Sequence, residues 1–159
     1  NYVTISVDEE SEGGLISADQ EICEGDTLAD LELSGHKGNI IKWQKSDDYA
    51  FTSPIDISET GSVLSGSTIG PLAETTYFRA VVQSGVCNEA YSDTAEIIVD
   101  PLTIAGTVSS DQNICYNSFP DDLVLSGQTG DVVRWEKSTD PAFPSPIRKR
   151  LLTKGCISR

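Results

Sequence analysis

The stretch from Asp30 to Ser46, DLELSGHKGNIIKWQKS, occurs a second time as DLVLSGQTGDVVRWEKS, from Asp122 to Ser138. The second stretch begins 92 residues after the first, and the two align without a gap. Each has the pattern of a strand, a glycine-containing turn and a second strand that carries a single Trp. A repeat of this period indicates two copies of one small structural unit.

The similarity extends beyond this stretch on both sides. Residues 13–57 and 105–149 share 21 identical residues in 45 aligned positions. The shared residues are those that a common fold requires, namely turn glycines, a core aromatic, a Cys and a loop Pro: Gly35/Gly127, Gly38/Gly130, Trp43/Trp135, Cys23/Cys115 and Pro54/Pro146. We therefore expect one complete module over residues 13–100 and the first half of a second module over residues 101–147.

The two ends of the chain lie outside this complete module. Residues 1–8 are predicted to be the last strand of a preceding repeat, because Tyr2–Asp8 shares the ending Ile-x-Val-Asp with Thr94–Asp100, 92 residues later. Residues 148–159 form a basic tail that matches no part of the module. We interpret this tail as a frame slip, a cloning scar or a truncated reading frame; a genuine basic tail is the alternative.

Short alternating segments predict strands throughout the module, and no segment has the 3.6-residue period or the capping residues of a helix. About seven short strands, with turns every 8–12 residues, are typical of an all-β immunoglobulin-like β-sandwich. Trp43 is expected to share a core-facing side of its strand with Ile41, while Lys42 and Gln44 face outward. The other expected core residues are Trp135, in the second copy, and Phe78. Since half a sandwich leaves an apolar face and an open edge, residues 101–159 are expected to be poorly ordered or prone to aggregate.

The charge of the chain is strongly acidic, with a formal net charge of −14. Before Arg148 there are 25 acidic and 6 basic residues. Such a surface repels nucleic acid and anionic membranes, so neither is an expected partner. No stretch approaches the roughly 20 apolar residues of a membrane helix. The first residues lack the features of a signal peptide, so the chain is expected to be an internal piece of a longer protein.

The cysteines suggest a covalent bond within the complete module. Cys23 and Cys87 are its two cysteines, and one pair per module is the arithmetic of an intramolecular disulfide in an oxidising compartment. The alternative is two free buried thiols. Zinc is not expected, because the chain has no CxxC motif and a single His.

No motif in the chain indicates catalysis or a cofactor. His36 is replaced by Gln128 in the second copy, and the chain contains neither a nucleophile elbow nor a phosphate-binding glycine loop. Asp47-Asp48 and Glu24-Gly25-Asp26 could supply oxygen ligands to calcium, but no DxDxDG loop is present. We expect no enzyme activity, no cofactor and no metal.

Several segments of the complete module resemble those of a known family. They are ISADQEIC (16–23), GDTLADLELSG (25–35), GNIIKWQKS (38–46), ETTYFRAVVQSGVC (74–87) and AEIIVD (95–100). Together they resemble the immunoglobulin-like, PKD-like tandem repeats of very large secreted and cell-surface adhesins of Bacteroidetes-type gliding bacteria. The resemblance implies export to the cell surface, neighbouring repeats of the same chain as partners, and no catalytic residues.

These features predict a non-catalytic repeat of a secreted or surface-anchored adhesin, acting as an adhesive or spacer unit. A surface glycan or protein is the expected class of ligand. The alternative function is an accessory carbohydrate-binding module of a secreted polysaccharide-degrading enzyme. Exposed aromatic residues would favour that alternative, and Tyr77, Arg79, Lys42 and Gln44 are candidates for a polar outer face.

Overall fold

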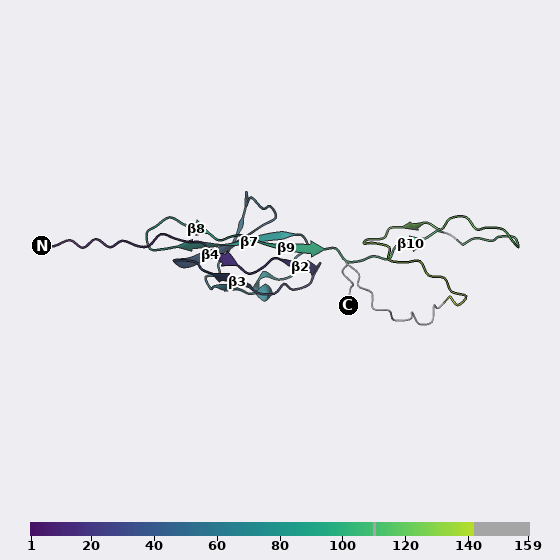
Figure 1. Cartoon of the computed structure of the whole chain (residues 1–159), viewed down its shortest axis with the longest axis horizontal. Helices are drawn as coiled ribbons and strands as arrows, with labels where there is room; N and C mark the ends of the chain where they lie inside the picture. Colours follow the sequence, from purple (N-terminus) through teal and green to yellow (C-terminus); the bar gives the residue numbers. More distant parts are fainter. Residues whose placement is uncertain (110, 142–159) are drawn as a thin grey trace. The chain divides into compact units, whose positions relative to one another are not determined.

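The computed structural model of this protein describes residues 1–109 and 111–141 (Figure 1). The chain divides into two units between Asp100 and Pro101. The basic tail of residues 148–159 lies outside the described residues.

The first unit is a sandwich of two β-sheets. The larger sheet has the strand order β2-β9-β7-β4-β5, and β8 also pairs with β7. Its strands are β2 (Gln20–Cys23), β4 (Asn39–Ser46), β5 (Ile55–Ile57), β7 (Thr76–Gln83), β8 (Ala90–Tyr91) and β9 (Ala95–Asp100). The smaller sheet has the order β1-β3-β6, with β1 (Leu15–Ile16), β3 (Leu31–Ser34) and β6 (Val63–Leu64). One helical turn, α1 (Gly66–Ile69), follows β6.

The pairing within these sheets confirms the predicted fold class. All neighbouring strands are antiparallel except β2 and β9, which run parallel with Gln20 beside Ile97. Strands β3 and β6 lie in one sheet while β4, β7 and β9 lie in the other, which is the division of strands in an immunoglobulin-like sandwich.

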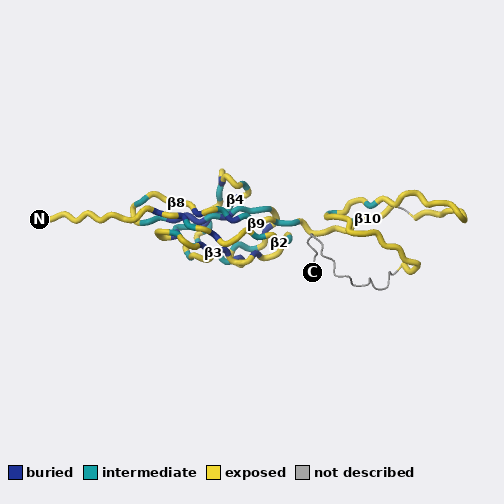
Figure 2. The backbone as a smooth tube through the Cα atoms, viewed as in Figure 1, coloured by how far each residue is buried: buried dark blue, intermediate teal, exposed yellow. Residues whose placement is uncertain are grey.

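The core lies between the two sheets and contains two of the predicted residues. Trp43 and Phe78 are fully buried, and the Trp43 indole Nε1 donates a hydrogen bond to the carbonyl oxygen of Gly61 (3.1 Å). Alternation along β7 directs Phe78, Ala80 and Val82 inward, and all three belong to the core cluster. Figure 2 shows the buried residues concentrated in this unit.

The prediction that Ile41 belongs to the core is wrong. The pairing of β4 with β7 shifts register between Ile40 and Lys42, so that Ile41 is an extra residue at a β-bulge. Because a bulge interrupts the strict alternation of a strand, Ile40 takes the buried position on the side of Trp43. Ile41 is only half-buried. Lys42 and Gln44 pair with Val81 and Arg79 on the opposite side, as predicted.

The second unit forms the same first hairpin as the first unit. Strands β10 (Thr107–Val108) and β11 (Leu125–Ser126) pair in the register of β1 and β3, displaced by 92 residues. None of its described residues is buried. Trp135 is 54% exposed, so the prediction that it is a core residue is wrong. Its counterpart Trp43 lies in a strand that pairs with β5 and β7 on either side, and the described part of the second unit contains no such strands.

Candidate functional site

A cluster of polar and aromatic side chains covers the side of the larger sheet that faces away from the core. We call this surface the outer face, and it comprises Lys42, Gln44, Tyr49, Phe51, Asp56, Tyr77, Arg79, Tyr91 and Glu96. The strands β4, β5, β7, β8 and β9 and the loop after β4 contribute to it. The sequence identified four of these residues, those of β4 and β7. The others come from the loop after β4, from the short strands β5 and β8, and from β9.

Arg79 is at the centre of the outer face. Its guanidinium carbon lies 4.1 Å from the centre of the Phe51 ring and 4.1 Å from the centre of the Tyr91 ring. Both distances fall within the range of cation–π interactions. The Arg79 Nε also donates a hydrogen bond to Gln44 Oε1 (2.9 Å). Three contacts therefore hold this side chain in one position.

The hydrogen bonds continue from Gln44 to Asp56. Gln44 Nε2 donates to Asp56 Oδ1 (2.8 Å), and Lys42 Nζ lies 2.8 Å from Asp56 Oδ2. The hydrogen bond from Lys42, with that from Gln44, lowers the pKa of Asp56. The same hydrogen bond raises the pKa of Lys42. Both oxygens of Asp56 are thus engaged by neighbouring side chains, which favours a role in organising this face.

Two tyrosines meet at the end of the outer face where β7 begins. The rings of Tyr49 and Tyr77 are 5.7 Å apart in an edge-to-face arrangement. Tyr77 Oη donates to Glu96 Oε1 (3.1 Å), and this hydrogen bond, together with desolvation, raises the pKa of Tyr77. Tyr49 is 71% exposed and Tyr91 is 51% exposed. The outer face therefore offers aromatic surface to solvent beside a fixed guanidinium group.

Phe51 reaches Arg79 from a tight loop after β4. Its φ angle of 52° is unusual for a residue with a bulky side chain. Asp48 stabilises this loop, since its carboxylate accepts hydrogen bonds from the Thr52 amide (3.1 Å) and the Thr52 hydroxyl (3.2 Å). Desolvation alone would raise the pKa of Asp48, but these hydrogen bonds lower it.

Asp48 recurs in the second copy as Asp140, and the structure gives a reason other than calcium. The Asp48 amide donates a hydrogen bond to Ser46 Oγ (3.2 Å), and the Asp140 amide donates the corresponding hydrogen bond to Ser138 Oγ (3.0 Å). The recurring residue therefore forms a turn. Among residues 1–109 and 111–141, no group of three or more His, Cys, Asp or Glu side chains is placed to hold a metal ion.

A second structured region joins the start of the chain to the first module. We call residues Asp8–Glu12 the linker. Asp8 Oδ2 accepts a hydrogen bond from the Val86 amide (3.1 Å), and Ser11 Oγ accepts one from the Ser84 amide (2.9 Å). Glu12 and Lys37 exchange backbone hydrogen bonds of 3.1 and 3.0 Å, and their side chains form an ion pair of 2.5 Å. The linker is thus held against the turn after β7.

We call the contacts between the linker and the module the joint, and its backbone pairing recurs in the second unit. Ile104 and Thr129, which correspond to Glu12 and Lys37, exchange backbone hydrogen bonds of 3.2 and 2.9 Å. Gly14 and Gly106 follow with φ angles of 80° and 71°. A Cβ at Gly14 would lie 2.4 Å from the Ser34 oxygen, and one at Gly106 would lie 2.5 Å from the Ser126 oxygen. The glycine is therefore required by the close approach of the backbone. The sequence analysis did not predict this joint. The available signal was the repeated Ile-x-Val-Asp ending, which comes just before the joint in both copies.

The prediction of a Cys23–Cys87 disulfide is wrong. Cys87 and Cys115 are free thiols, and Cys23 forms a disulfide in which neither takes part. Cys23 pairs with Asp100, beyond the Thr76 end of β7, whereas Cys87 follows Gln83 at the other end. An eight-residue strand is about 27 Å long. A disulfide requires Cα atoms within about 7 Å, so Cys23 and Cys87, at opposite ends of this strand, lie too far apart to form one.

No arrangement in the described residues indicates catalysis. His36 lies on the loop before β4, and its Nδ1 is the one buried side-chain nitrogen or oxygen among the described residues without a hydrogen-bond partner. The described residues also include no helix that could span a membrane.

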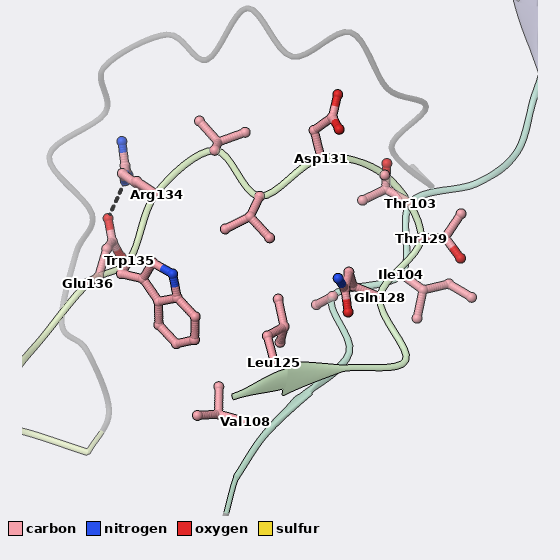
Figure 3. Close-up of a pocket in the computed structure, with 14 residues that line it drawn as sticks. Thr103, Ile104, Val108, Leu125, Gln128, Thr129, Asp131, Arg134, Trp135 and Glu136 are labelled. Atoms are coloured by element: carbon pink, nitrogen blue, oxygen red, sulfur yellow. Dashed lines mark hydrogen bonds and ion pairs between the residues drawn. The ribbon is translucent and has the colours of Figure 1, made fainter. Parts of the chain in front are cut away.

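The described part of the second unit contains a hollow (Figure 3). Val108, Leu125, Val132 and Trp135 line it, and they correspond to the buried residues Ile16, Leu33, Ile40 and Trp43. The hollow therefore lies where the first unit has its core, and its apolar lining follows from that correspondence.

Comparison with known proteins identifies a family. A family model described as a domain of unknown function (DUF8696) matches residues 12–101 and, separately, residues 104–151. No curated protein and no solved structure matches the chain. The two matches follow the two copies of the repeat and cover well over half of the residues. The chain therefore belongs to the DUF8696 family.

Proposed function

We propose that this chain is a non-catalytic, immunoglobulin-like repeat segment of a large secreted or surface-anchored adhesin, in which each complete module acts as a spacer. The observation that carries this proposal is the recurring joint between linker and module. Glu12 and Lys37 in one copy, and Ile104 and Thr129 in the other, differ in side chain but share the same backbone pairing. A joint formed by the backbone can be repeated along an array whose surface residues vary.

Contacts of the linker support a semi-rigid spacer. Asp8 is bonded to Val86, and Ser11 is bonded to Ser84, so two side chains anchor the linker to one turn. A Cβ at Gly85 would lie within 3 Å of the Asp8 carboxylate, which shows how closely the two segments approach. Fixed linkers transmit the orientation of one module to the next, as a rod requires.

The acidic surface is consistent with this role. The chain carries a net charge of −14, and like charges keep neighbouring copies of an exposed array apart. The resemblance to repeats of gliding-bacterium adhesins supports the extracellular location.

Hydrogen exchange measured by mass spectrometry on the 159-residue chain tests the spacer role. We expect residues 8–12 and 84–87 to be protected, and Asp8→Ala to accelerate exchange at both segments. Glu10→Ala, in the same linker, is the matched control and should leave the protection unchanged. Equal exchange in the wild type and Asp8→Ala would show that the joint is not held, and the proposal would lose its main support.

A second candidate function is carbohydrate binding by the outer face, as in an accessory module of a polysaccharide-degrading enzyme. The observation that favours it is the exposure of Tyr91, which lies against the guanidinium group of Arg79, and of Tyr49, which packs against Tyr77. Aromatic rings stack on sugar rings, and an immobile guanidinium can donate hydrogen bonds to sugar oxygens. Glycan-array binding that is lost in Tyr49→Ala and Tyr91→Ala, but kept in the control Tyr116→Ala in the second unit, would establish this function. No binding by the wild type would exclude it for the glycans tested.

A further inference from the structure

The two cysteines of the first module each lie beside the same position of the repeat. That position is the Asp that ends the shared Ile-x-Val-Asp sequence, which is Asp100 in this module and Asp8 in the segment before it. Asp100 is the last residue of β9, and Asp8 is the first residue of the linker. Contacts around these two Asp residues therefore show both sides of a junction between consecutive modules.

Cys23 lies at the end of β2, directly beside Asp100. The parallel register of β2 and β9 pairs the two residues, and neighbouring strands are about 4.8 Å apart. The amide of Glu24, the residue after Cys23, donates a hydrogen bond to the Asp100 carbonyl oxygen (2.8 Å). Ile22 packs against the core, so alternation directs Cys23 to the opposite side of the sheet, which is also the side of the paired Asp100.

Cys87 lies beside Asp8, in the turn after β7. Its Sγ donates hydrogen bonds to the carbonyl oxygens of Glu9 (3.3 Å) and Asp8 (3.8 Å). The Asp8 carboxylate accepts a hydrogen bond from the Val86 amide, and a Cβ at Gly85 would lie 2.0 Å from Asp8 Oδ2. The turn of residues 84–87 therefore lies on the side of the chain to which the Asp8 side chain points.

At a junction between modules, these two sets of contacts meet at one Asp. The β2 cysteine of the earlier module, which is the counterpart of Cys23, lies beside this Asp on the side of its carboxylate. Cys87 of the later module lies beside the same Asp and on the same side. The carbonyl oxygen of the Asp accepts hydrogen bonds from the residue after one cysteine and from the sulfur of the other. A disulfide requires Cα atoms within about 7 Å, and two cysteines that adjoin one residue on one side meet that requirement.

We propose that Cys87 forms a disulfide with the β2 cysteine of the module that precedes it in the array. This inference rests on the proposed function, because it requires consecutive modules. Cys87 is a free, half-buried thiol, and Cys23 forms a disulfide that leaves Cys87 free. The β2 cysteine recurs as Cys115. Two cysteines per module, which suggested one bond within each module, are accounted for equally by one bond across each junction.

The bond forms by oxidation of two thiols to one disulfide. The thiols lose two protons and two electrons, and a disulfide oxidant such as oxidised glutathione accepts them and becomes two thiols. Disulfides formed in this way persist in the oxidising environment outside the cell. The product cross-links the last strand pair of one module to the β7 turn of the next, so it limits rotation of one module against the other.

Peptide mapping of an extended chain tests this bond. In the extended chain, residues 1–100 are followed directly by residues 9–159, so that Asp100 of the first copy replaces Asp8 of the second. Four substitutions leave only the two cysteines that should pair: Cys87→Ser in the first copy, and Cys23→Ser, Cys115→Ser and Cys156→Ser in the second. After equilibration with reduced and oxidised glutathione, mass spectrometry of an unreduced digest of the monomeric fraction should recover a Cys23–Cys87 peptide as the main product.

A mirror chain is the matched control. It carries the same four substitutions with the copies exchanged for Cys23 and Cys87, so its remaining cysteines lie at the ends of their modules that face away from the junction. The yield of the linked peptide should be at least about tenfold lower, because these cysteines are too far apart to bond. In the extended chain with all its cysteines, iodoacetamide labelling of Cys87 should fall to about half of that in the 159-residue chain, because only the first copy keeps a free Cys87.

Equal yields of the linked peptide in the two chains would overturn the proposal, as would its absence from both or unchanged labelling of Cys87. Hydrogen exchange on the extended chain distinguishes failure of the bond from failure of the array. If the linker of the second copy is protected but the linked peptide is absent, the spacer role stands and only the disulfide is overturned. If the protection is absent as well, the joint proposed for the spacer is contradicted together with the bond.

Discussion

The two units contain the same early sequence, yet only the first buries a core. Their local structure agrees in detail. Gln20 bridges the amide and carbonyl of Ala29 (2.8 and 3.1 Å), and Gln112 bridges those of Asp121 (2.8 and 3.2 Å). The Ser17 hydroxyl accepts from the Glu32 amide (3.1 Å), and Ser109 does the same for Val124 (3.1 Å). Turns and side-chain bridges thus form from contacts near in sequence.

The cores differ because they depend on residues far apart in sequence. Trp43, in a strand that pairs with β5 and β7, is 0% exposed, whereas Trp135 is 54% exposed. Most of the stabilising free energy of a small domain comes from burying apolar surface. The comparison teaches that the hairpin frame can form without the core, and the following predictions test this separation.

The largest expected difference is between the two Trp residues. Trp43→Ala should destabilise the first unit by about 3–5 kcal/mol, because it removes the largest core side chain and leaves a cavity. Trp135→Ala should change the stability of the first unit by less than about 0.5 kcal/mol, as substitutions of exposed residues do. Urea unfolding followed by circular dichroism measures both. Similar losses in the two variants would contradict the separation of the units.

The next effect distinguishes two glycines with positive φ. Gly14→Ala should destabilise the first unit by about 1–3 kcal/mol, because φ is 80° and a Cβ would meet the Ser34 oxygen. Gly25→Asn should change stability by less than about 0.5 kcal/mol. The second copy places Asn117 at this position with a φ of 62°, and nothing lies within 4 Å of a Cβ at Gly25. A larger loss of stability in Gly25→Asn than in Gly14→Ala would contradict the conclusion that close backbone approach requires glycine at position 14 and not at position 25.

A smaller effect concerns the pH dependence of the outer face. The pKa of Asp56 is lowered by Lys42, so its contribution to stability is present above the unfolded value of about 3.9 and is lost as pH falls through the folded pKa. Asp56→Asn should therefore flatten the fall in stability between about pH 5 and pH 2. Lys42→Met should weaken the same dependence, since it removes the partner. If stability fell equally with decreasing pH in Asp56→Asn and in the wild type, the Lys42–Asp56 ion pair would be excluded as the cause of that fall.

The smallest expected effect is that of removing the Cys87 thiol. Because Cys87 forms no disulfide, Cys87→Ser should change stability by less than about 1 kcal/mol, whereas loss of a structural disulfide costs about 2–5 kcal/mol. Iodoacetamide labelling of the native protein under non-reducing conditions should modify Cys87 and Cys115. Recovery of a Cys23–Cys87 peptide would show that the two residues pair after all.

The amino-acid sequence by itself was sufficient to determine the repeat, the all-β class, the outward direction of Lys42 and Gln44, and the burial of Trp43 and Phe78. These features follow from the period-two alternation of strands and from residue types that turns require, which are local properties. A gap-free alignment of the copies also located turns such as Gly35 and Gly127, both with a φ near 70°.

Only the tertiary structure decided the remaining features, because each depends on pairing between distant segments. The bulge in β4 exchanged Ile41 for Ile40, and it is visible only in the register against β7. The parallel pairing of β2 and β9 carried Cys23 away from Cys87. The Arg79 cluster brings together residues from β7, β8 and the loop after β4. Trp135 shows the same principle in reverse: an apolar residue at a core-facing position is buried only where distant strands arrive to cover it.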